Sequence, residues 1–210
     1  MKKIGIIGYG ELGKQFEHHI KNSFKNVMFY YFDDIATLYG VTNAYPFNSF
    51  VNNEFKDIEF LLGLGYKHLK KKRELIKILD HHNLKLFTYI HPTAYVDNTA
   101  IIMDGCMIYP NVTIDRNVRI GRSCLINLSV TIAHDTTLQE CCFLAPSVSL
   151  SGFVTLGNNV FIGTGACVSN GIYIQDSAII GIGSVITKNV EKDNNIIGNP
   201  QKIVKNIILK

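Results

Sequence analysis

From Ile90 to Ile186 the chain keeps a hydrophobic period of six residues. An aliphatic residue stands at each of 17 positions without a slip: Ile90, Val96, Ile102, Ile108, Ile114, Ile120, Ile126, Ile132, Leu138, Leu144, Leu150, Leu156, Ile162, Val168, Ile174, Ile180 and Ile186. Four residues after each of them comes a small or β-branched residue: Ala94, Ala100, Cys106, Val112, Val118, Cys124, Val130, Thr136, Cys142, Val148, Val154, Val160, Ala166, Ile172, Ala178, Ser184 and Val190. Two phases held over this length indicate a repeating structural unit.

An α-helix cannot use this period, because its faces recur every 3.6 residues and the apolar positions would wander around the axis. A short strand followed by a turn can use it. Three such hexads close a triangular coil of about 18 residues, and parallel backbone pairing stacks successive coils about 4.8 Å apart. The aliphatic residue then points inward, with the small residue beside it. The pattern therefore predicts a parallel β-helix of about five to six coils.

The first ninety residues have a different pattern, in which short apolar runs alternate with helical spacing. The predicted strands are Lys2–Gly8, Val27–Phe32, Ile58–Leu62 and Leu84–Ile90, and the predicted helices are Leu12–Lys21 and His68–His82. This alternation predicts a small Rossmann-like α/β domain with a parallel sheet. The boundary is expected near His91-Pro92, which gives an α/β domain over 1–89, a β-helix over 90–191 and a C-terminal tail over 192–210.

Gly8-Tyr9-Gly10-Glu11-Leu12-Gly13 has the G-x-G-x-x-G spacing of a dinucleotide-binding turn, after a predicted strand and before a predicted helix. Its glycines permit a tight turn, and the N–H groups of a helix N-terminus attract anions. Asp33 lies 20 residues beyond Gly13, as in NAD enzymes. A full NAD site, however, usually draws on a larger doubly wound sheet than about 90 residues can build. The turn is therefore interpreted as a site for the diphosphate of a nucleotide sugar.

Composition narrows the classes further. The chain is 47% hydrophobic and 18% charged, which is typical of a folded protein. The net charge of +4 is mild, and Lys70-Lys71-Lys72-Arg73 points in several directions on a helix, so nucleic-acid binding is not expected. No run of 18 apolar residues predicts a membrane span. Five cysteines without CxxC spacing favour a reducing compartment, and the protein is expected to be cytoplasmic.

The hexad ladder and several local motifs resemble a known group of enzymes. The motifs are the glycine-rich turn, Phe32-Asp33-Asp34, Ile90-His91-Pro92-Thr93-Ala94, Ile126-Asn127 to His134-Asp135, Leu150-Ser151-Gly152 and Gly198-Asn199-Pro200-Gln201-Lys202. With them, the chain resembles the hexapeptide-repeat acyltransferases, and within these the sialic acid O-acetyltransferase-like, nucleotide-sugar N-acetyltransferases. The resemblance implies a left-handed β-helix and a homotrimer with acyl-CoA in grooves between neighbouring prisms. Handedness comes from the resemblance alone.

The implied activity is transfer of an acetyl group from acetyl-CoA to the amino group of a UDP- or dTDP-linked amino-deoxysugar, in the synthesis of bacterial surface glycans such as lipopolysaccharide. No metal is implied. O-acetyl transfer to a sugar hydroxyl and a non-catalytic, nucleotide-binding scaffold stay open as alternatives. A zinc site of the carbonic anhydrase kind is disfavoured, because it needs three histidines at solenoid spacing and His134 is alone there.

An amine that attacks a thioester must lose a proton, and His is the usual base near neutral pH. His134 matches the catalytic position of the family. Asp135 is expected to orient its imidazole, although neighbouring residues on a strand tend to face apart. Gly152 matches a glycine of the family, and the resemblance implies that its backbone N–H lies near the thioester, where it would meet the oxyanion of the intermediate. The resemblance also implies cofactor contacts from Asn127, Gly152, Thr164, Gly181, Gly183 and Lys202, and substrate contacts from Gly8, Gly10, Glu11, Leu12, Asp33, Asp34 and Gly65.

The sequence departs from the family pattern in three places. Phe143 stands where many members have a second histidine, and Ala133 stands before His134 where an acidic residue is common. Glu11-Leu12 replaces the Gly-His pair that is usual in the N-terminal turn. These departures leave the acyl chain length and the identity of the sugar open.

Overall fold

A computed structural model describes residues 1–205. The chain divides into two compact units, Met1–Tyr89 and a second unit that begins at Ile90. The helices and strands of the first unit are, in order, β1 (Lys2–Ile7), α1 (Glu11–Ser23), β2 (Val27–Phe32), α2 (Asp34–Leu38), β3 (Ala44–Tyr45), η1 (Phe47–Val51), η2 (Asn53–Phe55), β4 (Glu59–Leu62), η3 (Tyr66–His68), α3 (Leu69–His81) and β5 (Lys85–Leu86).

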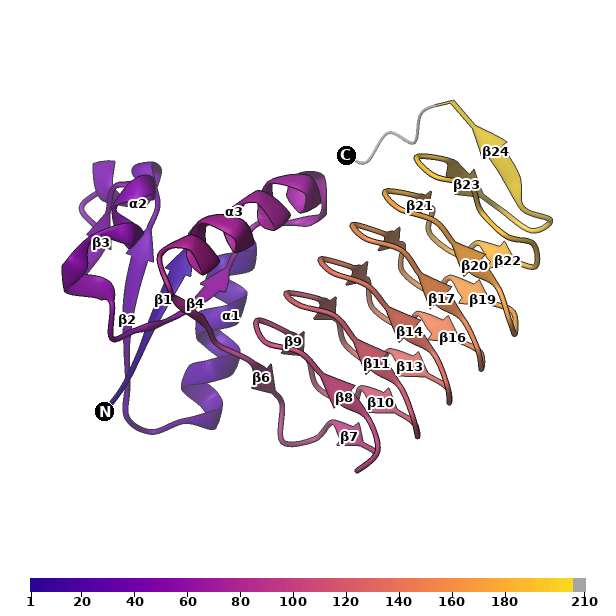
Figure 1. Ribbon diagram of the computed structural model, residues 1–210, viewed down its shortest axis with the longest axis horizontal. Helices are drawn as coiled ribbons and strands as arrows, with labels where there is room; N and C mark the ends of the chain where they lie inside the picture. Colours follow the sequence, from indigo (N-terminus) through magenta and orange to yellow (C-terminus); the bar gives the residue numbers. More distant parts are fainter. Residues whose placement is uncertain (206–210) are drawn as a thin grey trace. The chain divides into compact units, whose positions relative to one another are not determined.

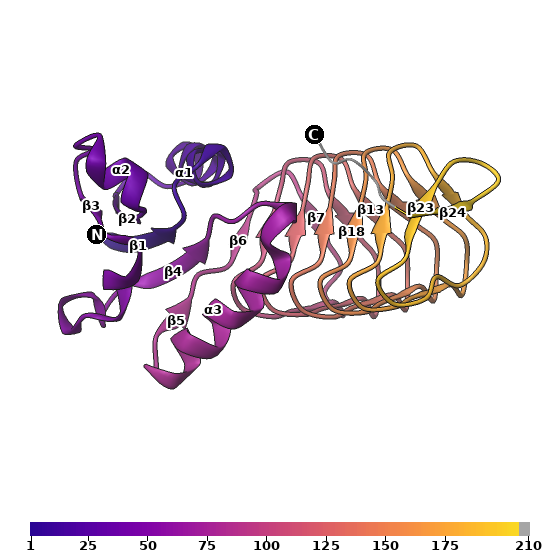
Figure 2. The same cartoon turned by 90° about the horizontal axis from the view of Figure 1, so that it is seen from above.

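The sheet of the first unit has the strand order β3-β2-β1-β4-β5, and every pair is parallel. From β1 the chain returns through α1 to β2 on one side, and from β4 it returns through α3 to β5 on the other. Because parallel crossovers are right-handed, these two helices cover opposite faces of the sheet, as Figure 2 shows. The strand order reverses between β1 and β4. In open α/β sheets, ligands bind in the crevice at the carboxyl ends of such a pair.

The sequence predicted most of this unit. β2 has the expected bounds, and α1 and α3 occupy the two expected helical segments. The short elements between β2 and β4 were not predicted, because helices and strands of two to five residues have too little periodicity to detect. The segment Leu84–Ile90, expected as one strand, contains two: β5 belongs to the α/β sheet, whereas β6 (Tyr89–Ile90) belongs to a sheet of the solenoid.

The second unit is a parallel β-helix (Figure 1). Its regular strands have two residues each and start every six residues: β7 (Tyr95–Val96), β8 (Ile101–Ile102), β9 (Met107–Ile108), β10 (Thr113–Ile114), β11 (Arg119–Ile120), β12 (Leu125–Ile126), β13 (Thr131–Ile132), β14 (Thr137–Leu138), β15 (Phe143–Leu144), β16 (Ser149–Leu150), β17 (Thr155–Leu156), β18 (Phe161–Ile162), β19 (Cys167–Val168), β20 (Tyr173–Ile174), β21 (Ile179–Ile180) and β22 (Val185–Ile186). They form three parallel sheets, each of which takes every third strand. Residues 18 apart therefore stack directly, as Ile132 does on Leu150.

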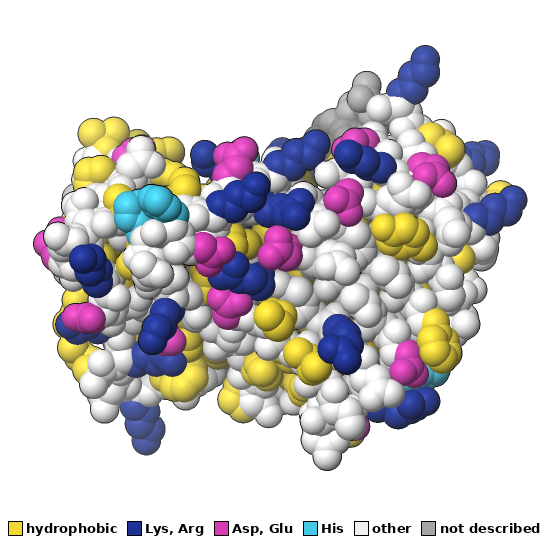
Figure 3. All heavy atoms as spheres, viewed as in Figure 1, with side chains coloured by type: hydrophobic (Ala, Val, Ile, Leu, Met, Phe, Trp, Pro, Cys, Tyr) yellow, Lys and Arg dark blue, Asp and Glu magenta, His cyan; other side chains and the backbone are white. Residues whose placement is uncertain are grey.

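Both phases of the hexad pattern line the interior. The second residue of the strands points inward, and Ile132, Leu144 and Leu156 are fully buried. Cys106, Cys124 and Cys142 occupy the small inward position, which confirms their role in filling the core. The outward positions of the sheet β22-β19-β16-β13-β10-β7 are mostly small and polar. In the view of Figure 3, Lys and Arg side chains lie interspersed with Asp and Glu side chains.

From residue 105 to residue 183, each hexad turns a corner through a residue in the left-handed region, with φ between 55° and 79°. Small polar residues and glycine tolerate this conformation best. Most of the residues that adopt it in the solenoid fit this rule: Gly105, Asn111, Asn117, Ser123, Ser129, Asp135, Cys141, Ser147, Asn159, Gly165, Gly171, Ser177, Gly183 and Asp193. Phe153 is the exception, with φ of 59°.

The hexad period ends with a shortened coil. Val190 is buried and pairs with Ile174, 16 residues earlier, so it takes an aliphatic place and not the small place that the period assigned to it. The expected tail over 192–210 contributes two strands: β23 (Asn195–Ile197) pairs with β21, and β24 (Lys202–Val204) pairs with β23 in antiparallel orientation. The last five residues of that segment, 206–210, lie outside the described residues. Within residues 1–205, no helix is long and apolar enough to cross a membrane.

Candidate functional site

His134 lies on one corner of the prism, in the turn between β13 and β14. Turns at 97–100, 115–118, 133–136, 151–154 and 169–172 stack on each other here, and we call this stack the His134 corner. The imidazole Nδ1 lies 2.9 Å from Oδ2 of Asp135, and the His134 side chain is 35% exposed. An ionised carboxylate can only accept a hydrogen bond, so Nδ1–H donates and the lone pair is left on Nε2. The pair therefore has the tautomer that a general base requires.

The sequence raised the concern that adjacent residues on a strand face apart. The structure removes it, because Asp135 is a turn residue with φ of 58°, and this conformation turns its carboxylate back toward the imidazole. Asp135 is also held from the preceding coil. Asn117 Nδ2 donates to its Oδ1 at 3.0 Å, and Arg116 Nη2 lies 3.7 Å from its Oδ2. The hydrogen bonds from His134 and then Asn117 lower the pKa of Asp135 below its ordinary value, so the carboxylate stays ionised.

Gly152 lies directly beside the imidazole, one coil after it. A methyl group built on Gly152 would sit 2.6 Å from Cε1 and 2.8 Å from Nε2 of His134, so only glycine leaves room for the ring. Among residues 1–205, the N–H of Gly152 has no hydrogen-bond acceptor. The basic nitrogen and this N–H thus belong to neighbouring turns of one corner, with Asn170 close to the same glycine.

Three residues of this corner were not predicted as site residues. Asn117 holds Asp135, Arg116 lies near it, and the ring of Phe153 meets the His134 ring edge to face, with centroids 5.2 Å apart and planes at 86°. The length of one coil, 18 residues, would have identified them from the sequence. Because residues 18 apart stack, the neighbours of His134 and Asp135 can be read from the sequence as Arg116, Asn117, Gly152 and Phe153.

The other predicted solenoid residues lie on a different corner. Asn127, Thr164, Gly181 and Gly183 belong to the turns that follow β12, β18 and β21, and these turns lead into the sheet that contains β13. Their contacts are local: the Asn127 Oδ1 caps the N–H of Leu128, and the Thr164 carbonyl accepts from Gly183 N–H. Lys202 begins β24 and is exposed. One chain therefore does not bring these residues together with His134.

The glycine-rich turn lies at the carboxyl end of β1, at the switch point of the first unit. Gly8 has φ of +87°, and its carbonyl oxygen would lie 2.5 Å from a methyl group on Gly13 and 2.1 Å from one on Gly63. These three glycines let β1, α1 and the end of β4 approach closely. Gly10 and Gly65 behave differently, since a methyl group on either would meet nothing within 4 Å. Gly10 and Gly65 thus have open space beside the backbone at this end of the sheet.

The other predicted substrate contacts surround this turn. Gly10 caps the start of α1, Glu11 in the first helical turn pairs with Lys14, and Leu12 is partly exposed. The Asp33 carboxylate accepts from the N–H of Tyr9 and of Ala36, so it caps α2 and holds the turn. Asp34 accepts from the N–H of Phe47 and is exposed. Both carboxylates therefore have a structural function at this edge of the sheet.

A second polar cluster holds the turn from the side chain of Tyr9. Glu17 on α1 accepts hydrogen bonds from the hydroxyls of Tyr9 and Tyr31 and pairs with Lys21. Burial raises the pKa of the Glu17 carboxyl, but the hydrogen bonds from Lys21, Tyr9 and Tyr31 together outweigh it, and the net pKa is lowered. Burial, with Glu17 beside it, raises the pKa of Tyr9 to about 12. The cluster ties β1, α1 and β2 together at the turn.

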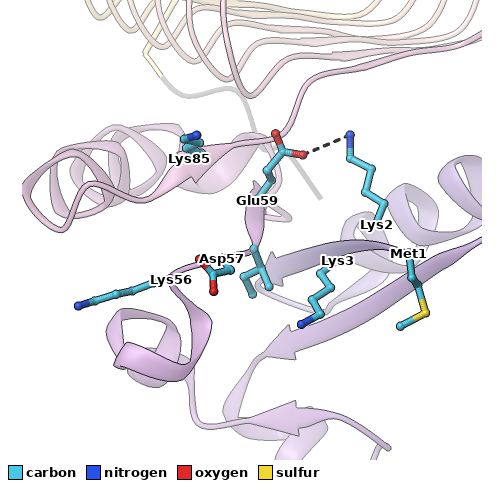
Figure 4. A pocket seen from close by; sticks show the side chains of 8 residues that line it. Met1, Lys2, Lys3, Lys56, Asp57, Glu59 and Lys85 are labelled. Atoms are coloured by element: carbon cyan, nitrogen blue, oxygen red, sulfur yellow. Dashed lines mark ion pairs between the residues drawn. The ribbon is translucent and has the colours of Figure 1, made fainter.

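A cavity of about 520 Å³ lies at the opposite, amino-terminal edge of this sheet (Figure 4). Lys2 there is paired with Glu59 at 3.2 Å, and the side chains of Lys3, Lys56 and Lys85 point in different directions. They do not converge on one ligand, so this cavity is not the candidate site. No group of three or more His, Cys, Asp or Glu residues in the described part of the chain could hold a metal ion.

Several solved structures have the same architecture as this chain. The chain superimposes on perosamine N-acetyltransferase from Caulobacter crescentus, solved as a histidine variant in complex with CoA and GDP-perosamine, with a TM-score of 0.88, 24% identity and 98% of each chain covered. The acetyltransferase domain of PglB from Neisseria gonorrhoeae gives a TM-score of 0.83 and 23% identity over 97% of this chain and 100% of that one. WeeI from Acinetobacter baumannii gives 0.87 and 20% over 97% and 100%.

No protein-family model matches the sequence, and no curated protein is similar enough to be matched. The likeness is therefore one of fold. It confirms the predicted fold class, a small parallel α/β domain followed by a left-handed parallel β-helix, and it confirms that the resemblance to sugar N-acetyltransferases holds over nearly the whole chain. This protein has the fold of the solved perosamine N-acetyltransferase and of the PglB acetyltransferase domain.

Proposed function

We propose that this protein is an acetyl-CoA-dependent N-acetyltransferase that acts on the amino group of a nucleotide-linked amino-deoxysugar. The observation that carries the proposal is the His134–Asp135 pair, with Nε2 of His134 close to Gly152. A solved neighbour of the same fold is in complex with CoA and GDP-perosamine, and another with acetyl coenzyme A. These ligands have the two chemical parts that the reaction requires.

In the proposed mechanism, His134 Nε2 takes the proton from the sugar amine as the nitrogen attacks the thioester carbonyl. Asp135 stabilises the imidazolium that forms, since its carboxylate stays ionised. The Gly152 N–H donates to the oxyanion of the tetrahedral intermediate. When the intermediate collapses, the C–S bond breaks, the new C–N bond remains, and the proton on His134 goes to the departing thiolate of CoA. No metal is needed for any of these steps.

The first unit is proposed to hold the acceptor. The diphosphate would approach the α1 N-terminus at Gly8, Gly10, Glu11 and Leu12, where the open glycine leaves the backbone accessible. Gly65, which also has open space beside it, is proposed to contact the same substrate. Asp33 and Asp34 lie at the same edge of the sheet, although their carboxylates already accept backbone hydrogen bonds.

The cofactor contacts are proposed to be shared between chains. In one prism, Asn127, Thr164, Gly181 and Gly183 lie on a different corner from His134. In a homotrimer, the His134 corner of one prism can lie against a different corner of the neighbouring prism, so that the two sets of residues come together. Lys202 is proposed to meet a phosphate of CoA. The five free cysteines agree with a reducing compartment, so we place the reaction in the cytoplasm, within surface glycan synthesis.

The test is turnover with acetyl-CoA and a panel of UDP-, dTDP- and GDP-linked 3-amino and 4-amino deoxysugars, followed by thiol release and by the mass of the product. The wild type is expected to release thiol with at least one amine. His134→Ala, checked for folding by its melting temperature, is expected to lose about 10²–10⁴-fold in kcat. If none of the amino sugars in the panel leads to thiol release, the proposal is wrong.

Two other outcomes identify the alternatives. An acetyl group on a sugar hydroxyl would favour the O-acetyltransferase, in which the same histidine serves as base. Binding of the nucleotide sugar without turnover, together with a His134→Ala variant that behaves as the wild type does, would favour the scaffold.

A further inference from the structure

Phe153 is out of place by the local rules of the solenoid. It adopts the left-handed conformation, with φ of 59°, which bulky side chains disfavour. The equivalent turn residues one coil before and one coil after it on the same corner are Asp135 and Gly171, and both suit this conformation. Asparagine or serine at this position would fold more easily. An aromatic residue held in a strained conformation points to a function.

Packing in the hydrophobic core of the solenoid does not explain Phe153. The residue is 55% exposed, and it is not part of the hydrophobic core of the solenoid. Its ring meets the His134 imidazole edge to face, at 5.2 Å between centroids. Gly171 and Gly152, its neighbours on the corner, add no side chain to cover it. In one chain, an exposed aromatic ring therefore lies beside the His134 imidazole.

The chemistry of the proposed acceptor fits such a surface. A sugar ring has an apolar face of C–H groups, which packs on the electron-rich face of an aromatic ring, whereas its hydroxyl groups need polar partners. A methyl group in place of a hydroxymethyl group makes that face more apolar. The charged parts of both substrates, the diphosphates, gain nothing from a phenyl ring.

We propose that Phe153 is a specificity-determining residue: it receives the apolar face of the acceptor sugar beside His134 and selects 6-deoxy amino sugars over their 6-hydroxy counterparts. This inference rests on the proposed N-acetyltransferase function. It names the part of the acceptor that the corner recognises, which the fold alone does not.

The test compares wild type with Phe153→Asn, which gives the turn a residue that suits its conformation, and with Phe153→Tyr, which keeps the ring. The probes are acetyl-CoA, the nucleotide-linked 4-amino-4,6-dideoxysugar that the wild type turns over best, and the matched sugar with a hydroxymethyl group. For Phe153→Asn we expect a KM for the deoxysugar about tenfold higher, with the preference over the hydroxymethyl sugar reduced by a similar factor. Its KM for acetyl-CoA should not change, and its melting temperature should not fall. Phe153→Tyr should behave as the wild type does.

Three results would overturn the inference. The first is an unchanged KM and an unchanged preference in Phe153→Asn. The second is a change in the KM for acetyl-CoA alone, which would assign the ring to the acyl donor. The third is a change in molecular mass in solution, which would assign the ring to a contact between copies of the chain. If the wild type itself acetylates no amino sugar, the proposed function fails, and this outcome is distinct from the other three.

Discussion

The side chain of Asn117 donates a hydrogen bond to Asp135 at 3.0 Å, so the carboxylate that holds the His134 imidazole is itself held from the preceding coil. The two residues are 18 positions apart, which is one coil of the solenoid. The stacking that builds the fold thus also builds a chain of orientation from Asn117 through Asp135 to His134. Asn117 touches no reacting atom in the proposed mechanism, and its role is one of positioning.

Replacing Asn117 by alanine should therefore act through Asp135. One neutral-to-charged hydrogen bond is worth about 1.5 kcal/mol, which corresponds to a loss of about tenfold in kcat. The KM values for both substrates should stay near those of the wild type. The measurement is steady-state kinetics over a pH series, since a freer carboxylate should also shift the acid limb of the profile.

Asn117→Ser, which keeps the left-handed turn but has a shorter side chain, is the matched control for the turn. If both variants keep the wild-type kcat and pH profile, then Asn117 only builds the corner and the proposed chain of orientation is wrong.

Gly152 offers a sharper test of the same corner. Alanine there would place a methyl group 2.6 Å from Cε1 of His134, so the ring must move. A displacement of about 1 Å at a reacting group can cost about 10²-fold in rate, and we expect a loss in kcat of this order. The melting temperature should change little, because the clash is with the end of a side chain and not with backbone.

Gly157→Ala is a suitable comparison for this variant. Its methyl group would meet Asp176 Oδ1 at 2.4 Å and the Asp176 backbone nitrogen at 2.6 Å, on a corner without His134. That variant should lose stability and keep its kcat. Equal kcat values for Gly152→Ala and wild type would mean that the imidazole is not the base.

The fold was predictable because the same hexad pattern of inward residues is repeated many times along the sequence. Each inward position, such as Ile132 or Leu150, repeats the choice made six residues earlier, so single exceptions do not hide the pattern. The end of the solenoid was less predictable. Val190 keeps an inward place although its coil is two residues shorter, and a rigid period assigns it to the wrong phase.

The site was predictable only in part, because its residues depend on turn conformation. Neighbouring side chains on a strand point to opposite faces, which would keep His134 and Asp135 apart. The left-handed φ of Asp135 is what brings its carboxylate to the imidazole. Phe153 could not have been found by type, since a phenylalanine in a hydrophobic repeat is usually core. It could have been found by position, since it stands one coil after Asp135.

Acid should loosen the turn of the first unit through Glu17. The pKa of its carboxyl is lowered in the folded protein, so its contribution to stability is present above the ordinary value of 4.5 and is lost as the pH falls through the lower folded value. Glu17→Gln should therefore be less stable than wild type at neutral pH, with the gap closing on acidification below that range. Urea unfolding at a series of pH values measures this. A gap that is independent of pH would mean that Glu17 acts by packing and not by charge.

Substitutions of two glycines in the Gly8–Gly13 turn should have different effects: Gly13→Ala should lower stability, and Gly10→Ala should weaken binding of the acceptor. A methyl group on Gly13 would lie 2.5 Å from the Gly8 carbonyl oxygen, so α1 would have to move away from β1, and Gly13→Ala should cost about 1–3 kcal/mol of stability. A methyl group on Gly10 meets nothing within 4 Å, and Gly10 has φ of −75°, which alanine adopts freely. Gly10→Ala should therefore keep its stability within about 0.5 kcal/mol.

What Gly10→Ala should lose is affinity for the acceptor. The added methyl group would occupy space beside the α1 N-terminus, where the diphosphate is proposed to bind, and one displaced hydrogen bond to a charged group corresponds to a KM for the nucleotide sugar about tenfold higher. The KM for acetyl-CoA should not change, since its proposed contacts lie in the solenoid. Urea unfolding of both variants, with KM values for both substrates, measures the separation. A Gly10→Ala variant with the wild-type KM for the nucleotide sugar would remove the glycine turn from the acceptor site and leave it as a packing device between β1 and α1.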